Sequence, residues 1–175
     1  MPFTNPTKII SDLHLEENSV VADFGCGDGG LTLPLATHLV GGKVYAIDVQ
    51  KELLDRTAKS AQDKGLSNIK FIWGDIEERG GSKIADSSVD TVILSNVLFQ
   101  SSAKYSILLE AKRVLRTGGK LVVIDWLDSF GGLGPQAGDV VSPDAVREIA
   151  TQAGLVEVDY SNTSDHHYVI IFVNR

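Results

Sequence analysis

The feature that most constrains this chain is a short apolar segment that leads directly into a glycine-rich turn. Residues 19–24 have the sequence SVVADF, a β-branched and apolar run that favours a strand. The next six residues, GCGDGG, include four glycines and predict a tight turn. Apolar residues at helical spacing follow from Leu31 to about Val40, and Gly41-Gly42 ends that helix. The segment therefore predicts a strand, a turn and a helix, which is the first unit of an α/β fold.

The same alternation continues along the chain. Further strands are predicted at 43–48, 69–73, 89–94 and 121–126, and helices at 51–64, at 105–116 and after the capping residue Ser142. Since these strands are apolar on both faces, we expect a parallel sheet that is covered by helices on both sides.

The last two predicted strands, 156–160 and 168–173, have no helix between them. A parallel crossover needs a dozen or more residues, so two strands with so short a link are expected to pair antiparallel. The fold class predicted is a single Rossmann-like, doubly wound, seven-stranded sheet, mostly parallel with an antiparallel last strand. The turn between the last two strands is then expected at the carboxyl edge of the sheet, where open α/β sheets bind their ligands.

Composition limits the classes of function. A chain of 175 residues fits one domain, and its net charge of -7 disfavours a sequence-independent grip on nucleic acid or on anionic lipid. No apolar run is long enough to span a membrane and the first residues lack a secretory signal pattern, so we expect a cytoplasmic protein. The single cysteine, Cys26, excludes an internal disulfide and a zinc site built from several thiolates.

The residue that precedes the glycine turn indicates which ligand the turn accepts. Gly25, Gly27 and Gly30 match the dinucleotide fingerprint, but Asp23 stands at the end of the strand. A carboxylate about 4 Å from a pyrophosphate would cost about 1 to 4 kcal/mol, so Asp23 disfavours a dinucleotide. A ligand with an ammonium group that faces Asp23 and a carboxylate that faces the glycine amides would fit this turn. S-adenosylmethionine has both groups.

The chain resembles the class I S-adenosylmethionine-dependent methyltransferases, in particular the group related to ubiquinone and menaquinone methyltransferases (type 11). The resemblance extends from Val20 to Val173 and rests on five segments in order: DFGCGDGG at 23–30, AID at 46–48, GDI at 74–76, VDTVILSNVLFQ at 89–100 and VLRTGGKLVVID at 114–125. It implies S-adenosyl-L-methionine as the cofactor and methyl transfer as the reaction.

The resemblance also implies roles for individual residues. Asp48 would hold the ribose hydroxyls, and Asp75 and the Ile76 amide would bind adenine. Ser95 and Asn96, at the end of a strand, would contact the cofactor or the acceptor. The predicted cofactor-binding residues are Asp23, Phe24, Gly25, Cys26, Gly27, Gly29, Asp48, Val49, Gly74, Asp75, Ile76, Ser95 and Asn96.

Other polar residues are given structural interpretations. Direct methyl transfer requires no covalent intermediate, so Cys26 is interpreted as a packing residue. Asp90 is interpreted as a structural cap, and His14 and His38 are placed in helices. His166 and His167 follow Asp165 in the last turn; they are too few for a metal site, and none is predicted. His167 is the candidate general base, against the interpretation of a solvated turn histidine.

Two segments, together with the residues around His166 and His167, are predicted to choose the acceptor: the N-terminal segment, with residues 1–18 as a lid helix before a core of 19–175, and the loop 126–141. The glycines of this loop predict mobility without acceptor. So small a lid leaves the site open to a bulky acceptor, or to closure by a second copy of the chain or by a partner. A small-molecule acceptor is favoured over nucleic acid, and a homodimer is kept as an alternative.

Two functions from other classes compete with this prediction. An NAD-dependent oxidoreductase is disfavoured by Asp23 and by the lack of a Tyr-x-x-x-Lys pair after the fourth strand. A non-catalytic cofactor-binding subunit of a methyltransferase complex stays open, because no separate acceptor domain is evident. The acceptor itself is not identified by the sequence.

Overall fold

The computed structural model describes residues 5–130, 132 and 134–175. Predictions that concern residues 1–4, 131 and 133, which belong to the two acceptor segments, lie outside this description. The strands are β1 Val20–Phe24, β2 Lys43–Asp48, β3 Ile69–Trp73, β4 Val89–Ser95, β5 Leu115–Trp126, β6 Leu155–Ser164 and β7 His167–Asn174. The helices are α1 Pro6–Asp12, α2 Thr32–His38, α3 Lys51–Asp63, the short 3-10 helix η1 Leu98–Gln100, α4 Lys104–Val114 and α5 Pro143–Gln152.

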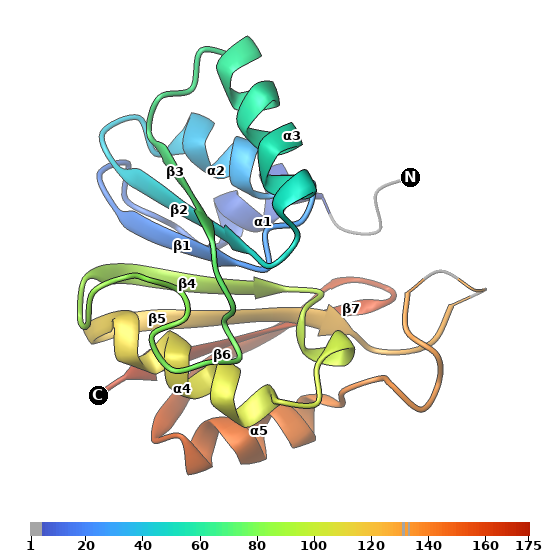
Figure 1. Ribbon diagram of the computed structural model, residues 1–175. Helices are drawn as coiled ribbons and strands as arrows, with labels where there is room; N and C mark the ends of the chain where they lie inside the picture. The colour runs from blue at the N-terminus through green and yellow to red at the C-terminus, as the bar shows by residue number, and fades with distance from the viewer. Residues whose placement is uncertain (1–4, 131, 133) are drawn as a thin grey trace.

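The seven strands form one sheet in the order β3-β2-β1-β4-β5-β7-β6. The pairs among β1 to β5 are parallel, whereas β7 pairs antiparallel with both β5 and β6. Figure 1 shows helices on both faces of this sheet, with α4 and α5 on one face and α1, α2 and α3 on the other. The predicted fold class is confirmed, including the antiparallel last strand beside β5.

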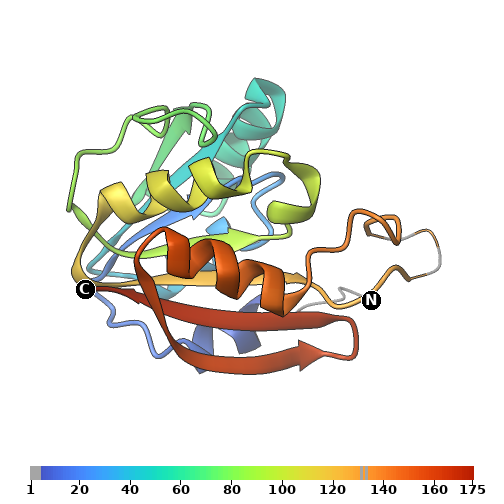
Figure 2. The same ribbon diagram turned by 90° about the horizontal axis from the view of Figure 1, so that it is seen from below.

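Each face of the sheet has its own apolar core. On one face, α4 and α5 bury residues such as Leu108 and Val146 against Phe24 and Leu94. On the other face, Ile9 and Ile10 of α1 pack with apolar side chains of α2 and with those of β1, β4 and β5 that point toward this face. Figure 2 shows the same layers from below, with α4 and α5 stacked over the strands. Because α1 is anchored in this core, none of its residues lines the cavity described below, and the lid role of residues 1–18 stays a prediction.

Several predicted boundaries are wrong. The helix predicted to run to Arg116 ends at Val114, because Leu115 already has extended backbone and begins β5. The sixth strand extends to Ser164 instead of Tyr160, since pairing with β7 accommodates the polar residues that follow. His14 does not lie in a helix: it follows α1 with a left-handed φ of 48°. Sequence patterns detect burial, but these ends are set by backbone pairing.

The capping predictions agree with the structure. The Ser142 side chain accepts a hydrogen bond from the amide of Ala145 and begins α5, as its sequence context predicts. Asp90 also has the structural role expected of it, because its carboxylate accepts a hydrogen bond from the Val20 amide at 2.7 Å and pairs with Arg116. No described helix is long and apolar enough to cross a membrane.

Candidate functional site

The strand order reverses between β1 and β4, because β2 and β3 lie on one side of β1 and β4 and β5 on the other. Such a switch point leaves a crevice at the carboxyl ends of the strands. A cavity of about 450 Å³ lies there. Its lining residues are Gly25, Gly27, Ile47, Asp48, Val49, Gln50, Leu53, Gly74, Asp75, Ile76, Glu77, Val97, Gln100, Ser101 and Ile107.

The cavity gathers seven of the thirteen predicted binding residues from the ends of three strands: Gly25, Gly27, Asp48, Val49, Gly74, Asp75 and Ile76. The other six do not line it: Asp23, Phe24, Cys26, Gly29, Ser95 and Asn96. Phe24 is fully buried in the core, and Cys26 packs near Ala46 and Leu54. Burial, with Asp23 and Asp48 nearby, raises the pKa of the Cys26 thiol, which agrees with a packing role.

The glycine turn presents its amides differently from the prediction. The amides of Gly25 and Cys26 donate to the Ile47 carbonyl at 2.8 and 3.0 Å, and the Gly27 amide donates to Asp48 at 2.9 Å. The Gly29 amide donates to the Cys26 carbonyl. These four amides already have acceptors within the protein, and the expectation that the turn binds a ligand carboxylate stays a prediction.

The glycines themselves allow close approach. Gly25 has φ +73°, and a Cβ there would lie 2.7 Å from Val97, so the segment after β4 packs directly on the turn. Gly29 has φ +80°, and a Cβ would lie 2.3 Å from Thr57 of α3. Any side chain at either position would push the turn away from these neighbours.

Asp23 is buried behind the turn, with 2% of its surface exposed. Its carboxylate accepts a hydrogen bond from the Thr32 hydroxyl at 2.6 Å, the one side-chain hydrogen bond that it receives from the described residues. Burial raises the pKa of Asp23 to about 6, and the nearby Asp48 contributes to the rise. Two carboxylates thus flank the glycine turn and make its surroundings negative.

Asp48 connects the turn to the end of β2. Its Oδ2 accepts a hydrogen bond from the Gly27 amide at 2.9 Å and its Oδ1 accepts one from the Gln50 amide at 2.8 Å. Because each carboxylate oxygen has two lone pairs, one on each oxygen stays available to the cavity that Asp48 lines.

The segment after β3 forms the opposite wall. Asp75 accepts a hydrogen bond from the Glu77 amide at 2.9 Å, and the buried side chain of Ile76 supplies an apolar surface. Glu77 in turn accepts a hydrogen bond from the Ser101 hydroxyl at 2.6 Å. This bond connects the wall after β3 to the wall after β4.

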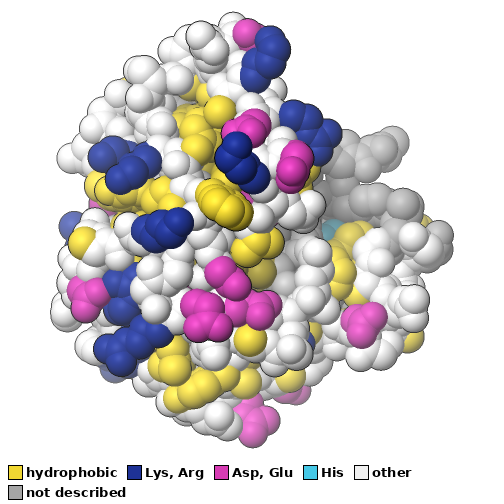
Figure 3. All heavy atoms as spheres, in the orientation of Figure 1, with side chains coloured by type: hydrophobic (Ala, Val, Ile, Leu, Met, Phe, Trp, Pro, Cys, Tyr) yellow, Lys and Arg dark blue, Asp and Glu magenta, His cyan; other side chains and the backbone are white. Residues whose placement is uncertain are grey.

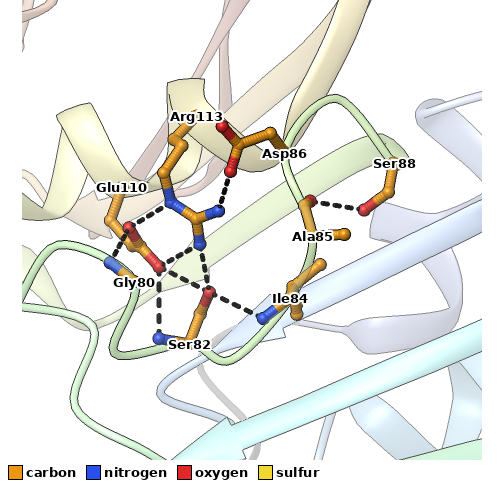
Figure 4. A network of polar contacts seen from close by, with 8 residues as sticks. All are labelled: Gly80, Ser82, Ile84, Ala85, Asp86, Ser88, Glu110 and Arg113. Atoms are coloured by element: carbon orange, nitrogen blue, oxygen red, sulfur yellow. Dashed lines mark hydrogen bonds and ion pairs between the residues drawn. The ribbon is translucent and has the colours of Figure 1, made fainter.

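A buried ion pair between Glu110 and Arg113 holds residues 80–82, which lie farther along the segment that follows β3, as Figure 4 shows. Glu110 of α4 accepts hydrogen bonds from the amides of Gly80 and Ser82 at 2.8 and 3.1 Å, and Arg113 donates to it at 2.7 and 2.8 Å. Burial acts to raise the pKa of Glu110, but these bonds outweigh it and lower the pKa to about 2. Arg113 also pairs with Asp86.

The residue that follows β4 has a left-handed backbone conformation. Asn96 has a left-handed φ of 58°, which is uncommon for residues other than glycine. Its amide donates to the Ile124 carbonyl at 2.8 Å, and its side-chain Oδ1 is buried without a hydrogen-bond partner among the described residues. Ser95 and Asn96 lie at the carboxyl edge, as expected, but outside the cavity lining.

The paired histidines have different environments. His167 is fully buried, with its ring centroid 4.1 Å from that of Trp126, so the interpretation as a solvated turn residue is wrong for it. Burial, and then His166, lowers the pKa of His167 to about 4. His166 is the more accessible of the two, and its Nδ1 lies 2.9 Å from Asp128. The role of His167 as a general base stays a prediction. No group of three or more possible metal ligands occurs in the described part of the chain.

The sequence analysis missed the segment that follows β4. Val97, Gln100 and Ser101 line the cavity. The first two belong to a stretch, 89–100, that was matched only as a motif, and Ser101 follows it. It also assigned no role to Asp125, whose carboxylate accepts a hydrogen bond from the Leu98 amide at 3.1 Å. The signal was the position of Asp125 at the end of a strand, which it shares with Asp23 and Asp48.

A family model described as a methyltransferase domain matches residues 15–151. The ubiquinone/menaquinone biosynthesis C-methyltransferase UbiE of Shewanella sp. (strain W3-18-1) is 26% identical over 179 residues, which cover 83% of this chain and 69% of that protein. An arsenite methyltransferase of Aquipseudomonas alcaligenes is 35% identical over 111 residues, which cover 60% of this chain and 32% of that protein.

Solved structures agree with the family match. The crystal structure of a SAM-dependent methyltransferase from Aquifex aeolicus superposes with a TM-score of 0.90 at 25% identity, covering 99% of this chain and 91% of that one. The predicted oxidoreductase and non-catalytic alternatives are set aside. With the family match spanning most of the residues and the fold matching throughout, the chain belongs to the methyltransferase domain family and is an S-adenosylmethionine-dependent methyltransferase.

Proposed function

We propose that the cavity at the switch point holds S-adenosylmethionine and that the methyl group passes to a small-molecule acceptor at the carboxyl ends of β4 and β5 and the amino end of β7. The observation that carries the proposal is the convergence of three strand-end motifs, after β1, β2 and β3, on one cavity of about 450 Å³. A nucleoside-sized ligand fits a cavity of this size.

The residues present fit the nucleoside part of the cofactor. Asp48 keeps a lone pair on each carboxylate oxygen, which suits the two ribose hydroxyls. At the adenine end, Ile76 and Val49 offer apolar surface, and Asp75 lines the cavity with a carboxylate that can accept from an exocyclic amine.

The charge of the site favours a cationic ligand. Asp23 and Asp48 lie on either side of the glycine turn, and the turn amides are already bonded. A pyrophosphate would meet negative charge here and find few free donors, whereas a sulfonium or ammonium group would be stabilised.

S-adenosylmethionine, when bound, supplies an electrophilic methyl group. The protein then contributes alignment and exclusion of water. Asp48 and Asp75 fix the nucleoside, and the 97–101 segment covers the glycine turn, since Val97 packs against Gly25. No covalent step at Cys26 is needed, which agrees with its burial.

The acceptor region follows from what stays outside the cofactor cavity. The start of the loop 126–141 and the turn at His166 lie together at the carboxyl edge, linked by the hydrogen bond from the Leu127 amide to the His166 carbonyl. Ser95, the last residue of β4, pairs with Ile124 of β5, and the Asn96 amide donates to the Ile124 carbonyl, two residues before this loop begins. We propose that these segments choose the acceptor.

A small molecule is the class of acceptor we favour. The two relatives named above act, by their names, in ubiquinone/menaquinone biosynthesis and on arsenite. The net charge of -7 disfavours a nucleic acid. On the face drawn in Figure 3, acidic side chains gather near the centre and basic ones lie mainly toward the left and top, so this face has no continuous basic surface.

Calorimetry tests the cofactor site. S-adenosylhomocysteine is expected to bind with micromolar affinity and NAD is not. Asp48→Ala should weaken binding of the first by about 1.5–3 kcal/mol, since it removes hydrogen bonds to a charged group. Tight binding of NAD, or an unchanged affinity in a folded Asp48→Ala variant, would contradict the proposal. A screen of small-molecule, lipid-quinone and protein acceptors with labelled S-adenosylmethionine then tests the acceptor class.

A further inference from the structure

Asp125, at the end of β5, has a fully buried carboxylate that the proposed function does not use. It accepts hydrogen bonds from the Leu98 amide at 3.1 Å and from its neighbour Trp126 at 2.9 Å, and the Phe99 amide bonds to it as well. Two of these donors belong to the segment that follows β4, 27 residues away for Leu98. One carboxylate thus fastens that segment to β5.

The fastened segment, residues 97–101, forms a wall shared by two cavities. Val97, Gln100 and Ser101 line the cofactor cavity, and Val97 also packs on the glycine turn at Gly25. Phe99, Gln100 and Ser101 line a second cavity of about 470 Å³, whose other side is formed by residues 138–142. Movement of this segment would change both cavities together.

The segment has little regular secondary structure of its own. Its regular part is the three-residue helix η1, which has no side-chain cap at its amino terminus. So short a 3-10 helix is not stable by itself, because few backbone bonds offset the entropy of ordering it. The amides of Leu98 and Phe99 lie in its first turn, and Asp125 accepts from both. The buried carboxylate therefore supplies from a distant strand what a local capping residue would otherwise supply.

The environment of Asp125 agrees with this role. Burial raises its pKa to about 6, and the three amides and Lys104 act in the opposite direction. A carboxylate in so buried a place is costly unless donors surround it. The hydrogen bonds from these amides offset part of that cost.

We propose that Asp125 is a positioning residue for the cofactor: through the amides of Leu98 and Phe99 it holds residues 97–101 in the place where they close the cavity over the glycine turn. The inference rests on the proposed function, since it requires that this cavity binds S-adenosylmethionine. Asp125 acts through the backbone of the segment and does not itself line the cavity.

The test compares Asp125→Ala and Asp125→Asn with Asp159→Asn. The control is matched, because Asp159 also accepts the amide of the next residue at 2.9 Å but lies exposed on β6. Amide hydrogen exchange without ligand reports on Leu98 and Phe99, and calorimetry with S-adenosylhomocysteine reports on the cavity. Thermal unfolding shows whether each variant is folded.

Asp125→Ala should speed amide hydrogen exchange at residues 98–99 at least tenfold and weaken the binding of S-adenosylhomocysteine at least tenfold. Asp125→Asn should change both quantities in the same direction but by less. Asp159→Asn should change neither. A general loss of stability would instead raise exchange throughout the sheet. If Asp125→Ala fails to fold, Asp125→Asn decides the test with the same two measurements.

The outcomes separate the two proposals. Folded Asp125 variants that bind S-adenosylhomocysteine within twofold of the wild type, or that keep slow exchange at 98–99, would overturn this inference and leave the proposed function standing. A wild type that does not bind S-adenosylhomocysteine, or whose affinity Asp48→Ala leaves unchanged, would overturn the proposed function and this inference together.

Discussion

Asp23 and Asp125 end two parallel strands of the same sheet, are both buried, and have their pKa values raised to about 6 mainly by burial. They differ in what donates to them. Three backbone amides bond to Asp125, whereas among the described residues a single hydroxyl, that of Thr32, bonds to the Asp23 side chain. The acid with many internal donors shapes the protein, and the acid with one keeps the capacity to stabilise a cationic ligand.

Glu110 extends the comparison to a third buried acid. It is surrounded by Arg113 and by the donors of Gly80 and Ser82, and it has no role at the carboxyl edge. Its pKa is lowered where those of the two aspartates are raised. We propose that the number of internal donors distinguishes acids that only order the protein from an acid that also acts on a ligand, and the following predictions test that distinction.

The largest effect is expected for Glu110→Ala. It leaves Arg113 and two amides without their acceptor, and we expect the free energy of unfolding to fall by about 3–5 kcal/mol at pH 7. Because the pKa is lowered from 4.5 to about 2, this contribution is present above about pH 4.5 and is lost as pH falls toward 2. Urea unfolding at pH 7 and pH 3 measures it. Glu157→Gln, which affects the exposed pair with Arg147, is the control and should cost less than about 1 kcal/mol. Equal losses in both variants would contradict the comparison.

Asp23→Asn should weaken the binding of S-adenosylhomocysteine by about 1.5–3 kcal/mol, because the substitution removes the negative charge behind the glycine turn. Methylthioadenosine, which has the nucleoside but no amino-acid group, should bind as it does to the wild type. Titration calorimetry with both ligands measures the difference. Asp28→Asn removes an exposed charge from the same turn and should change neither affinity. If Asp23→Asn weakens both ligands equally, Asp23 does not recognise the ammonium group.

The stability of the ligand-free protein should change in opposite directions for the two aspartates. At pH 8, Asp23→Asn should stabilise the folded protein by about 1–3 kcal/mol. The substitution removes a buried charge that has one donor, and the side-chain amide oxygen of the new residue can still accept from Thr32. Asp125→Asn should destabilise by about 1–3 kcal/mol, because its amide group cannot accept from all three amides. Denaturant unfolding of both variants measures the signs, and two changes of the same sign would break the comparison.

The affinity for S-adenosylhomocysteine should fall about tenfold between pH 7 and pH 5. Asp23 with a pKa of about 6 is charged at the higher pH and mostly neutral at the lower one, so its attraction for a cation is lost on acidification. In the same window the ligand-free protein gains stability from this group, since a raised pKa favours the protonated folded state. Calorimetry across this range should give a flat profile for Asp23→Asn. A profile that keeps its slope in that variant would assign the titration to Asp125 instead.

The smallest effect on the affinity for the cofactor product is expected for His167→Ala. His167 packs on Trp126 in the acceptor half and lines no part of the cofactor cavity, so the affinity for S-adenosylhomocysteine should stay within twofold of the wild type. Turnover of an acceptor found by the screen should change, because the substitution alters the packing under the loop 126–141. A variant with wild-type turnover would show that the acceptor binds elsewhere.

The amino-acid sequence by itself determined the order of strands and helices along the chain and predicted where the ligand binds. Apolar runs such as 43–48 are local patterns, and a strand end followed by glycine or by an acid has a fixed meaning at the edge of a parallel sheet. The resemblance to the class I methyltransferases, which rests on such segments, implied one site for Asp48, Gly74 and Asp75, and the three line the same cavity.

Only the tertiary structure decided which polar groups were still available to a ligand. The amides of Gly25 and Gly27 are free in any local interpretation, but Ile47 and Asp48 accept from them once β1 and β2 pair. Asp125 reaches Leu98, and Glu110 reaches Ser82, across separations of 27 and 28 residues. Burial and hydrogen bonding between residues so far apart depend on how the sheet and helices pack, and no local sequence pattern encodes that.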